Sequence, residues 1–104
     1  MVQEVSWYII DTAGTITAGA AAVKKAGAKQ VYAACTHGIF SGDGIKRINE
    51  SCFEEVVISD TIPLKDPSES PKIKVLSVAD MIAQTIERIE NGLPLSEVYD
   101  LYNV

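Results

Sequence analysis

Four short runs of apolar and β-branched residues recur along the chain, separated by segments of different periodicity. The first run ends at the small and polar residues Asp11-Thr12-Ala13-Gly14. Runs of this length that are bounded by turn residues are typical of β-strands. The pattern predicts strands over Val5–Ile10, Gln30–Cys35, Glu55–Ser59 and Ile73–Leu76.

The segments between the first three runs have the spacing of helices. Thr15 to Ala26 is rich in alanine, carries Lys24 and Lys25 near its end, and is followed by Gly27. Basic residues in the last turn and a glycine directly after it are typical of a helix C-terminus. A second, short helix is expected over Ile45–Ser51.

The residues after the fourth run predict two further helices. Ser77-Val78-Ala79-Asp80 fits a capping box, and Asn91-Gly92 is a stop signal. Apolar residues at helical spacing predict the buried face of the first of these helices (Ile82, Ile86, Ile89) and a last short helix (Leu95, Val98, Leu101).

Alternating strands and helices indicate an α/β fold with a mainly parallel sheet. The second run, Gln30–Cys35, is almost wholly apolar, which suits a strand covered on both faces. The length of 104 residues is that of one domain. We therefore expect a single domain over 1–104, built as a three-layer sandwich.

Composition narrows the classes of partner. The net charge is −5; the first 30 residues hold three lysines against two acidic residues, and the remaining residues hold six basic against twelve acidic ones. An acidic chain favours neither nucleic acid nor an anionic membrane as a partner. With one histidine and two cysteines, Cys35 and Cys52, a structural zinc site is not expected, and both thiols are interpreted as reduced and buried.

The turn after the first predicted strand has the composition of an anion-binding loop. Asp11, Thr12, Ala13, Gly14 and Thr15 lie between a strand and a helix, where small residues allow a ligand to approach and helix N–H groups can bind phosphate. Many strand-to-helix turns use the same residues only to cap the helix. Composition alone leaves both interpretations open.

Further segments carry a resemblance to a known family. Asp11-Thr12-Ala13-Gly14-Thr15 resembles the phosphoribosyl pyrophosphate loop of type I phosphoribosyltransferases. With the segments that follow it in family order, the chain resembles the C-terminal part of ribose-phosphate pyrophosphokinases, also called PRPP synthetases: Thr36-His37-Gly38-Ile39-Phe40-Ser41-Gly42, Arg47-Ile48-Asn49, Thr61-Ile62-Pro63-Leu64 and Lys72-Ile73-Lys74-Val75-Leu76-Ser77-Val78-Ala79.

The resemblance implies half of a phosphoribosyltransferase-type domain, with Rossmann-like layers. It also implies descent from a cytoplasmic, Mg²⁺-dependent enzyme of nucleotide biosynthesis that makes PRPP and AMP from ATP and ribose 5-phosphate. Asp11–Thr15 match the part of the family loop that binds the 5-phosphate. The family places two acidic residues before this loop to hold the ribose hydroxyls, and Trp7 and Tyr8 occupy those positions here.

Two functional classes follow from this comparison. The first is a functional part of a ribose-phosphate diphosphokinase. The second, which we favour, is a truncated and engineered non-catalytic scaffold that keeps a remnant phosphate loop, uses no cofactor and acts by folding, self-assembly or partner binding. An uncovered sheet edge predicts a homodimer, with Trp7 and Tyr8 as interface residues. His37, Thr36 and Ser41 are interpreted as structural residues of a loop after the second strand.

Overall fold

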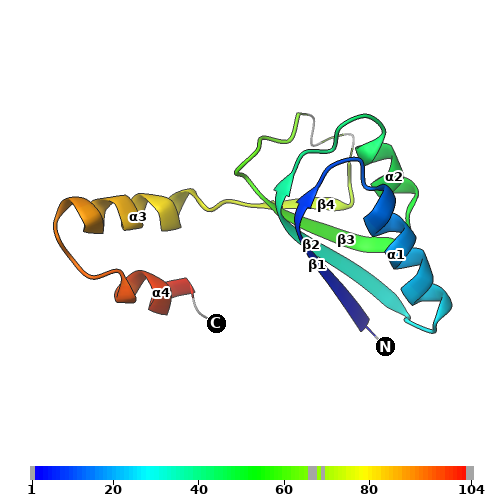
Figure 1. Ribbon diagram of the computed structural model, residues 1–104, viewed down its shortest axis with the longest axis horizontal. Coiled ribbons are helices and arrows are strands. Elements are labelled where there is room, and N and C mark those ends of the chain that lie inside the picture. Colours follow the sequence, from blue (N-terminus) through cyan, green and yellow to red (C-terminus); the bar gives the residue numbers. More distant parts are fainter. Residues whose placement is uncertain (1, 66–67, 69, 103–104) are drawn as a thin grey trace.

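The computed structural model describes residues 2–65, 68 and 70–102; within the first strand it describes the backbone and, of the side chains, only that of Ile10. The elements alternate as the sequence predicts (Figure 1). In chain order they are β1 (Val2–Ile10), α1 (Gly14–Lys25), β2 (Gln30–Gly38), α2 (Gly44–Glu50), β3 (Phe53–Ser59), β4 (Ile73–Leu76), α3 (Ala79–Glu90) and α4 (Ser96–Tyr102).

The four strands form one parallel sheet in the order β1-β2-β3-β4. Val5 of β1 pairs with Ala33 of β2, and Val56 of β3 pairs with Ile73 of β4. The order leaves β1 and β4 as the two edges of the described sheet. The predicted α/β class with a parallel sheet is confirmed.

β2 extends three residues beyond the predicted strand and includes part of the expected loop. His37 pairs with Ile9, and Gly38 pairs with Ile10. The polar residues Thr36 and His37 end the apolar pattern, but the neighbouring strand β1 continues and supplies backbone partners. Pairing between strands thus overrides the local pattern here.

The core lies between the sheet and the two helices α1 and α2, which also contact each other. One face of β2 alternates strictly, with Val31, Ala33 and Cys35 buried, while Tyr32 and Ala34 are half-buried. Fully burying a Val or Ile side chain contributes about 1.5–3 kcal/mol. The principal buried residues of this layer are Ile16, Ala20, Val31, Ala33, Ile48, Phe53, Val56 and Ile58.

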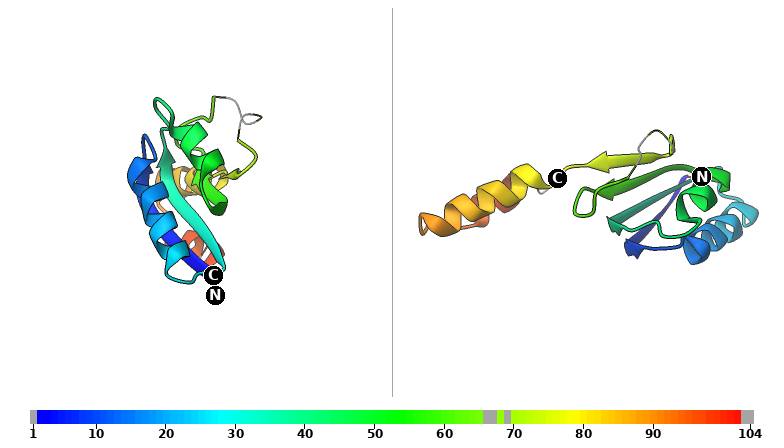
Figure 2. Two further views of the ribbon diagram at one scale, coloured as in Figure 1. Left: turned by 90° about the vertical axis from the view of Figure 1, so that its right-hand side faces the viewer. Right: turned by 90° about the horizontal axis from the view of Figure 1, so that it is seen from above.

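Helices α3 and α4 form an arm that projects from the end of β4 (Figures 1 and 2). The radius of gyration is 16.2 Å, against about 13 Å for a compact chain of this length. The main contacts of α3 are with α4. The described residues therefore form two of the three expected layers, because the last helices lie beside the sheet and not over its second face.

The prediction that Ile82, Ile86 and Ile89 form a buried face of α3 is wrong for the residues that the structure describes. Ile82 is 46% exposed, Ile86 56% and Ile89 62%. The amphipathic pattern is present, but no described element covers it. Of the three residues predicted to mark the last helix, Val98 is buried, Leu95 is half-buried and Leu101 is exposed.

The predicted capping box at the start of α3 does not form. The helix begins at Ala79, after Val78, without a side-chain cap. Ser77 Oγ accepts a hydrogen bond from the Ala79 N–H at 3.2 Å, and the Val78 N–H donates to Asp60 Oδ1 at 2.9 Å. Asp60, at the carboxyl end of β3, therefore anchors the arm at its root.

Two further findings concern membrane-spanning helices and the state of the two cysteines. Within the described ranges, no helix is both long and apolar enough to cross a bilayer. Both cysteines are free thiols, with Cys35 buried as expected and Cys52 only half-buried.

Candidate anion-binding site

The loop from Asp11 to Thr15 lies at the carboxyl end of β1 and opens α1. The helix has no side-chain cap, and its first turn contains no acidic residue. The first N–H groups of a helix have no partners within it and carry the positive end of the helix dipole. A cavity of about 160 Å³ lies here, lined by residues 10–16. Its backbone donors and size suit a small anion such as a phosphate group.

Ala13 holds the loop in an uncommon conformation. Its φ of 66° and ψ of 6° are those of the left-handed region, and its side chain is buried. This region costs an L-residue roughly 1–2 kcal/mol. Thr17 supports the geometry from α1, because its Oγ1 donates to the Ala13 carbonyl at 2.7 Å and its backbone N–H donates to the same oxygen at 3.1 Å.

The segment after β2 packs against the same loop. The Ile39 N–H donates to the Ile10 carbonyl at 2.8 Å. Ser41 Oγ donates to Asp11 Oδ1. Phe40, which lies between them in the chain, is buried and has a φ of 53°. The two strand ends are thus tied together by backbone and side-chain hydrogen bonds.

Helix α2 adds a third contact with the loop through Arg47. Its Nη1 donates to the Thr12 carbonyl at 3.0 Å. A β-carbon built on Gly14 would lie 3.4 Å from the same nitrogen. Arg47 and Gly14 also line an open groove of about 700 Å³ between α1 and α2.

The fold thus brings residues Asp11–Thr15 together in one short loop, as expected from their contiguity. It places the backbone of Trp7 opposite Cys35 in the sheet, while the side chains of Trp7 and Tyr8 lie outside the described ones. Sequence reasoning missed Arg47 as a loop contact and did not connect Ser41 with Asp11. The available signal in the sequence was that both Arg47 and Ser41 lie in segments that resemble the family.

A separate group of polar side chains ties the carboxyl end of β2 to the segment after β3. His37 Nδ1 lies 2.7 Å from Thr61 Oγ1, and Ser59 Oγ donates to the Thr36 carbonyl at 2.5 Å. These contacts agree with the structural role predicted for His37 and Thr36. Burial raises the pKa of the neighbouring Cys35 thiol, which disfavours a reactive thiolate there.

The loop residues do not by themselves fit the Mg²⁺ ion that the resemblance implies. Mg²⁺ favours carboxylate and water oxygens in an octahedral arrangement. Asp11 supplies one carboxylate, which also accepts the Ser41 hydroxyl. Among the residues that the structure describes, no group of three or more His, Cys, Asp or Glu side chains is placed to hold a metal ion.

Comparisons with known proteins match most of the chain. Residues 4–100 match the family described as phosphoribosyl synthetase-associated domain. The chain is 48% identical over 92 residues to ribose-phosphate pyrophosphokinase from Fusobacterium nucleatum, and 50% identical over 92 residues to the enzyme of that name from Oceanobacillus iheyensis. Each alignment covers 88% of this chain and 29% of the relative.

A solved structure supports the same assignment. The crystal structure of phosphoribosylpyrophosphate synthetase from Mycobacterium smegmatis matches with a TM-score of 0.84 at 32% identity, covering 88% of this chain and 30% of that one. The chain thus spans less than a third of the length of these relatives. It belongs to the phosphoribosyl synthetase-associated domain family and is homologous to one part of ribose-phosphate pyrophosphokinase.

Proposed function

We propose that this chain is a non-catalytic α/β scaffold that retains a binding site for the 5-phosphate of ribose 5-phosphate at Asp11–Thr15 and that self-associates. The observation that carries the phosphate site is the uncapped start of α1 beside a small cavity, in a loop whose residues match the family's phosphate-binding motif. The family's cytoplasmic location is part of the proposal.

The phosphate site is expected to be weak. No lysine lines the cavity, and its ligands would be backbone N–H groups with the hydroxyls of Thr12 and Thr15. We expect a dissociation constant in the millimolar range, roughly 4 kcal/mol of binding free energy. Titration with ribose 5-phosphate, followed by backbone amide shifts, tests the site. Shifts at Thr12, Gly14 and Thr15 support it, whereas no movement at these three residues rejects it.

Trp7 and Tyr8 speak against catalysis by this chain. Diphosphoryl transfer depends on positioning of the ribose and on stabilisation of charge by Mg²⁺. An indole and a phenol cannot replace the two carboxylates that the resemblance implies at these positions. We therefore expect no release of AMP when the chain is given ATP, Mg²⁺ and ribose 5-phosphate.

The alternative is that the chain is a functional part of a ribose-phosphate diphosphokinase, as the names of its relatives suggest. Turnover above background in the AMP assay favours this alternative. Replacing Trp7 and Tyr8 together by Asp is a matched test of the acidic pair. If the double variant gains turnover while the original chain has none, the aromatic residues alone block an otherwise competent site.

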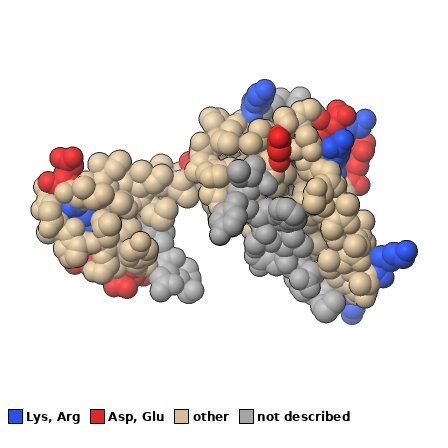
Figure 3. Space-filling view, viewed as in Figure 1, with Lys and Arg blue, Asp and Glu red and all other residues tan. Residues whose placement is uncertain are grey.

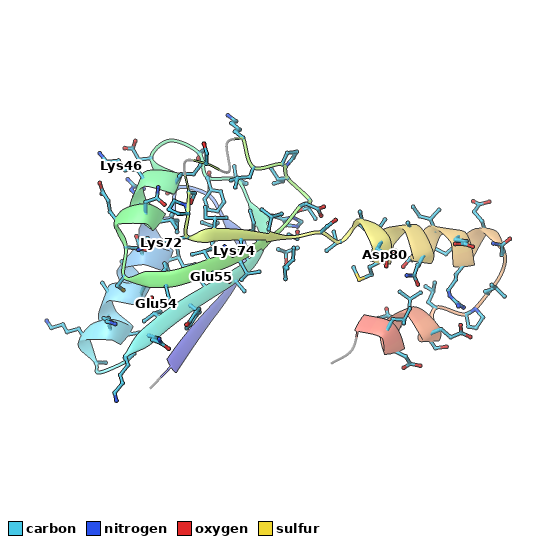
Figure 4. All side chains as sticks on the ribbon, turned by 180° about the vertical axis from the view of Figure 1, so that it is seen from behind. Lys46, Glu54, Glu55, Lys72, Lys74 and Asp80 are labelled. Carbon is cyan, nitrogen blue, oxygen red and sulfur yellow. The ribbon has the colours of Figure 1, made fainter. Side chains whose placement is uncertain are left out.

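Self-association is proposed from the two edges of the sheet. Lys72 directly precedes β4 and Lys74 lies on it (Figure 4), and lysines on an edge strand discourage pairing with another chain. β1 has one charged residue, Glu4, among its nine residues. A second copy that pairs along β1 would extend the sheet and remove this open edge. Light scattering over a range of protein concentrations measures the resulting mass.

The arm offers further apolar surface to such a dimer. In Figure 3 the visible surface of the α3–α4 arm is largely uncharged, with acidic side chains at its outer margins and a basic group between them. Exposed apolar side chains include Ile86, Ile89 and Leu101. Contiguous apolar surface of this kind is typical of protein interfaces. The proposed scaffold function therefore predicts that copies of the chain assemble. A strictly monomeric chain contradicts this part of the proposal.

A further inference from the structure

Arg47 contacts the phosphate loop from helix α2 but does not line the cavity of that loop. The cavity is lined by residues 10–16, whereas Arg47 lines the adjoining groove between α1 and α2, which shares Gly14 with the cavity. It contacts the loop backbone through the hydrogen bond from Nη1 to the Thr12 carbonyl, which is 3.0 Å long and spans 35 positions of the chain. The hydrogen bond to the Thr12 carbonyl thus gives Arg47 a route to the bound anion through the loop backbone.

That hydrogen bond orients the peptide directly before the strained residue. The Thr12 carbonyl and the Ala13 N–H belong to one planar trans peptide, so they point in opposite directions. Holding the carbonyl toward α2 turns the Ala13 N–H away from Arg47. It also restricts rotation about the bonds of Ala13, whose left-handed φ of 66° is disfavoured for a residue with a β-carbon.

We infer that Arg47 is a positioning residue that keeps Ala13 left-handed and so presents the loop N–H groups to a phosphomonoester. The inference rests on the proposed function for the identity of the ligand, but the effect on the ligand-free loop is independent of it. Strained backbone persists where neighbouring structure holds it, and Arg47 supplies a charged donor for this purpose.

The test is a double-mutant cycle on the full chain. Arg47→Met removes the guanidinium donors and keeps an extended apolar stem, and Ala13→Gly removes the β-carbon that disfavours the left-handed region. With ribose 5-phosphate as the probe, Arg47→Met should weaken binding about tenfold in the parent, the loss expected for a charged hydrogen bond. In the Ala13→Gly background its effect should fall to about threefold or less.

Two further variants distinguish a positioning role of Arg47 from a direct effect of its positive charge. Lys46→Met removes a neighbouring positive charge on α2 at the periphery of the body (Figure 4). It should leave the affinity within about twofold. Arg47→Lys, which keeps a cationic donor, should restore part of the lost affinity. Equal losses from Arg47→Met in both backgrounds would overturn the inference, because they indicate that Arg47 attracts the anion directly.

A ligand-free measurement keeps the two proposals distinguishable. Backbone shifts and the intraresidue amide-to-Hα coupling of Ala13 report its φ. Arg47→Met should move these values away from the left-handed range, and Lys46→Met should not. If the parent binds no ribose 5-phosphate, the proposed function fails while this measurement still decides the role of Arg47. An unchanged Ala13 in Arg47→Met contradicts the inference.

Discussion

Gly44 lies so close to Asp11 that a β-carbon on it would sit 2.8 Å from the Asp11 carbonyl oxygen. The first residue of α2 therefore touches the backbone at the start of the Asp11–Thr15 loop. The nearby Phe40 side chain closes the same space, 3.4 Å from that β-carbon position. Only a residue without a side chain permits this approach, which ties the placement of α2 to the shape of the loop.

Replacing Gly44 by Ala should destabilise the chain and disturb the loop. The added methyl group meets backbone and a buried ring, neither of which can move freely, so we expect a loss of about 1–3 kcal/mol in the free energy of unfolding. Denaturant unfolding measures the loss, and amide shifts at Thr12 and Gly14 report the loop.

Gly19→Ala is the matched control, because nothing lies within 4 Å of a β-carbon at this exposed position of α1. It should stabilise the chain by up to about 1 kcal/mol through helix propensity. Equal effects of the two substitutions would show that α2 does not constrain the loop through Gly44.

The sheet was predictable because its signals are local. Each strand is a short apolar run bounded by turn residues, and the alternation of these strands with helices indicates a parallel sheet. The true end of β2 was not predictable from Thr36 and His37, whose polarity indicates a loop. Their strand geometry depends on pairing with Ile9 and Ile10, which no local pattern contains.

The candidate site, like the sheet, was predictable only in part. Residues Asp11–Thr15 are contiguous, so their composition could predict an anion-binding turn. The contact of Arg47 with the Thr12 carbonyl could not be predicted, because a backbone carbonyl has no sequence signature and the partners are 35 positions apart. Amphipathicity likewise identified Ile82, Ile86 and Ile89 as one apolar face of α3, but the prediction that this face is buried is wrong, because no element of the described chain covers it.

Ile48 and Ile86 provide a test of which apolar residues are buried in solution. Ile48 on α2 is completely buried, and Ile86 on α3 is 56% exposed. Ile48→Ala should lower the free energy of unfolding by about 2–5 kcal/mol, because it removes buried surface and leaves a cavity. Ile86→Ala should change it by less than about 0.5 kcal/mol if the arm is free.

Unfolding of both variants at low and high protein concentration separates the possibilities. A cost for Ile86→Ala that grows with concentration indicates that a second copy covers the arm. A large cost that does not depend on concentration contradicts the projecting position of α3, because the residue must then be buried within one chain.

The hydrogen bonds that Asp60 accepts at the start of the α3–α4 arm should depend on pH. A hydrogen bond from the Ser77 side chain, together with the Val78 N–H, holds the pKa of Asp60 below its ordinary value of 3.8. A carboxylate whose pKa is depressed by folding stabilises the fold above the unfolded pKa, and this contribution is lost as the pH falls through the folded pKa. The anchor should therefore be intact at neutral pH and weaken only below about pH 4.

Amide exchange and chemical shift of the Val78 N–H between pH 7 and pH 2 measure this transition. Asp60→Asn is the control, since its side-chain oxygen still accepts a hydrogen bond but does not titrate in this range. A midpoint above pH 4, or the same titration in Asp60→Asn, contradicts the assignment of the transition to Asp60.

Trp7 and Tyr8 stay predicted interface residues. They lie on β1, an edge of the described sheet, where a second copy would pair. Burying one large aromatic side chain at an interface contributes roughly 1.5–3 kcal/mol, and Trp and Tyr are the residue types that most often dominate binding. Replacing both by Ala should therefore shift the chain toward monomer, as measured by light scattering at several concentrations.

Tyr99→Ala controls for the loss of an aromatic ring as such, because Tyr99 lies on α4 and is 72% exposed. If pairing along β1 is the main contact of the assembly, it should leave both mass and melting temperature unchanged. If the Trp7 and Tyr8 double variant keeps its mass but melts at a lower temperature, the pair packs within one chain and the prediction that they are interface residues is wrong. If Tyr99→Ala alone reduces the mass, assembly depends on the arm, and pairing along β1 must be given up as its main contact.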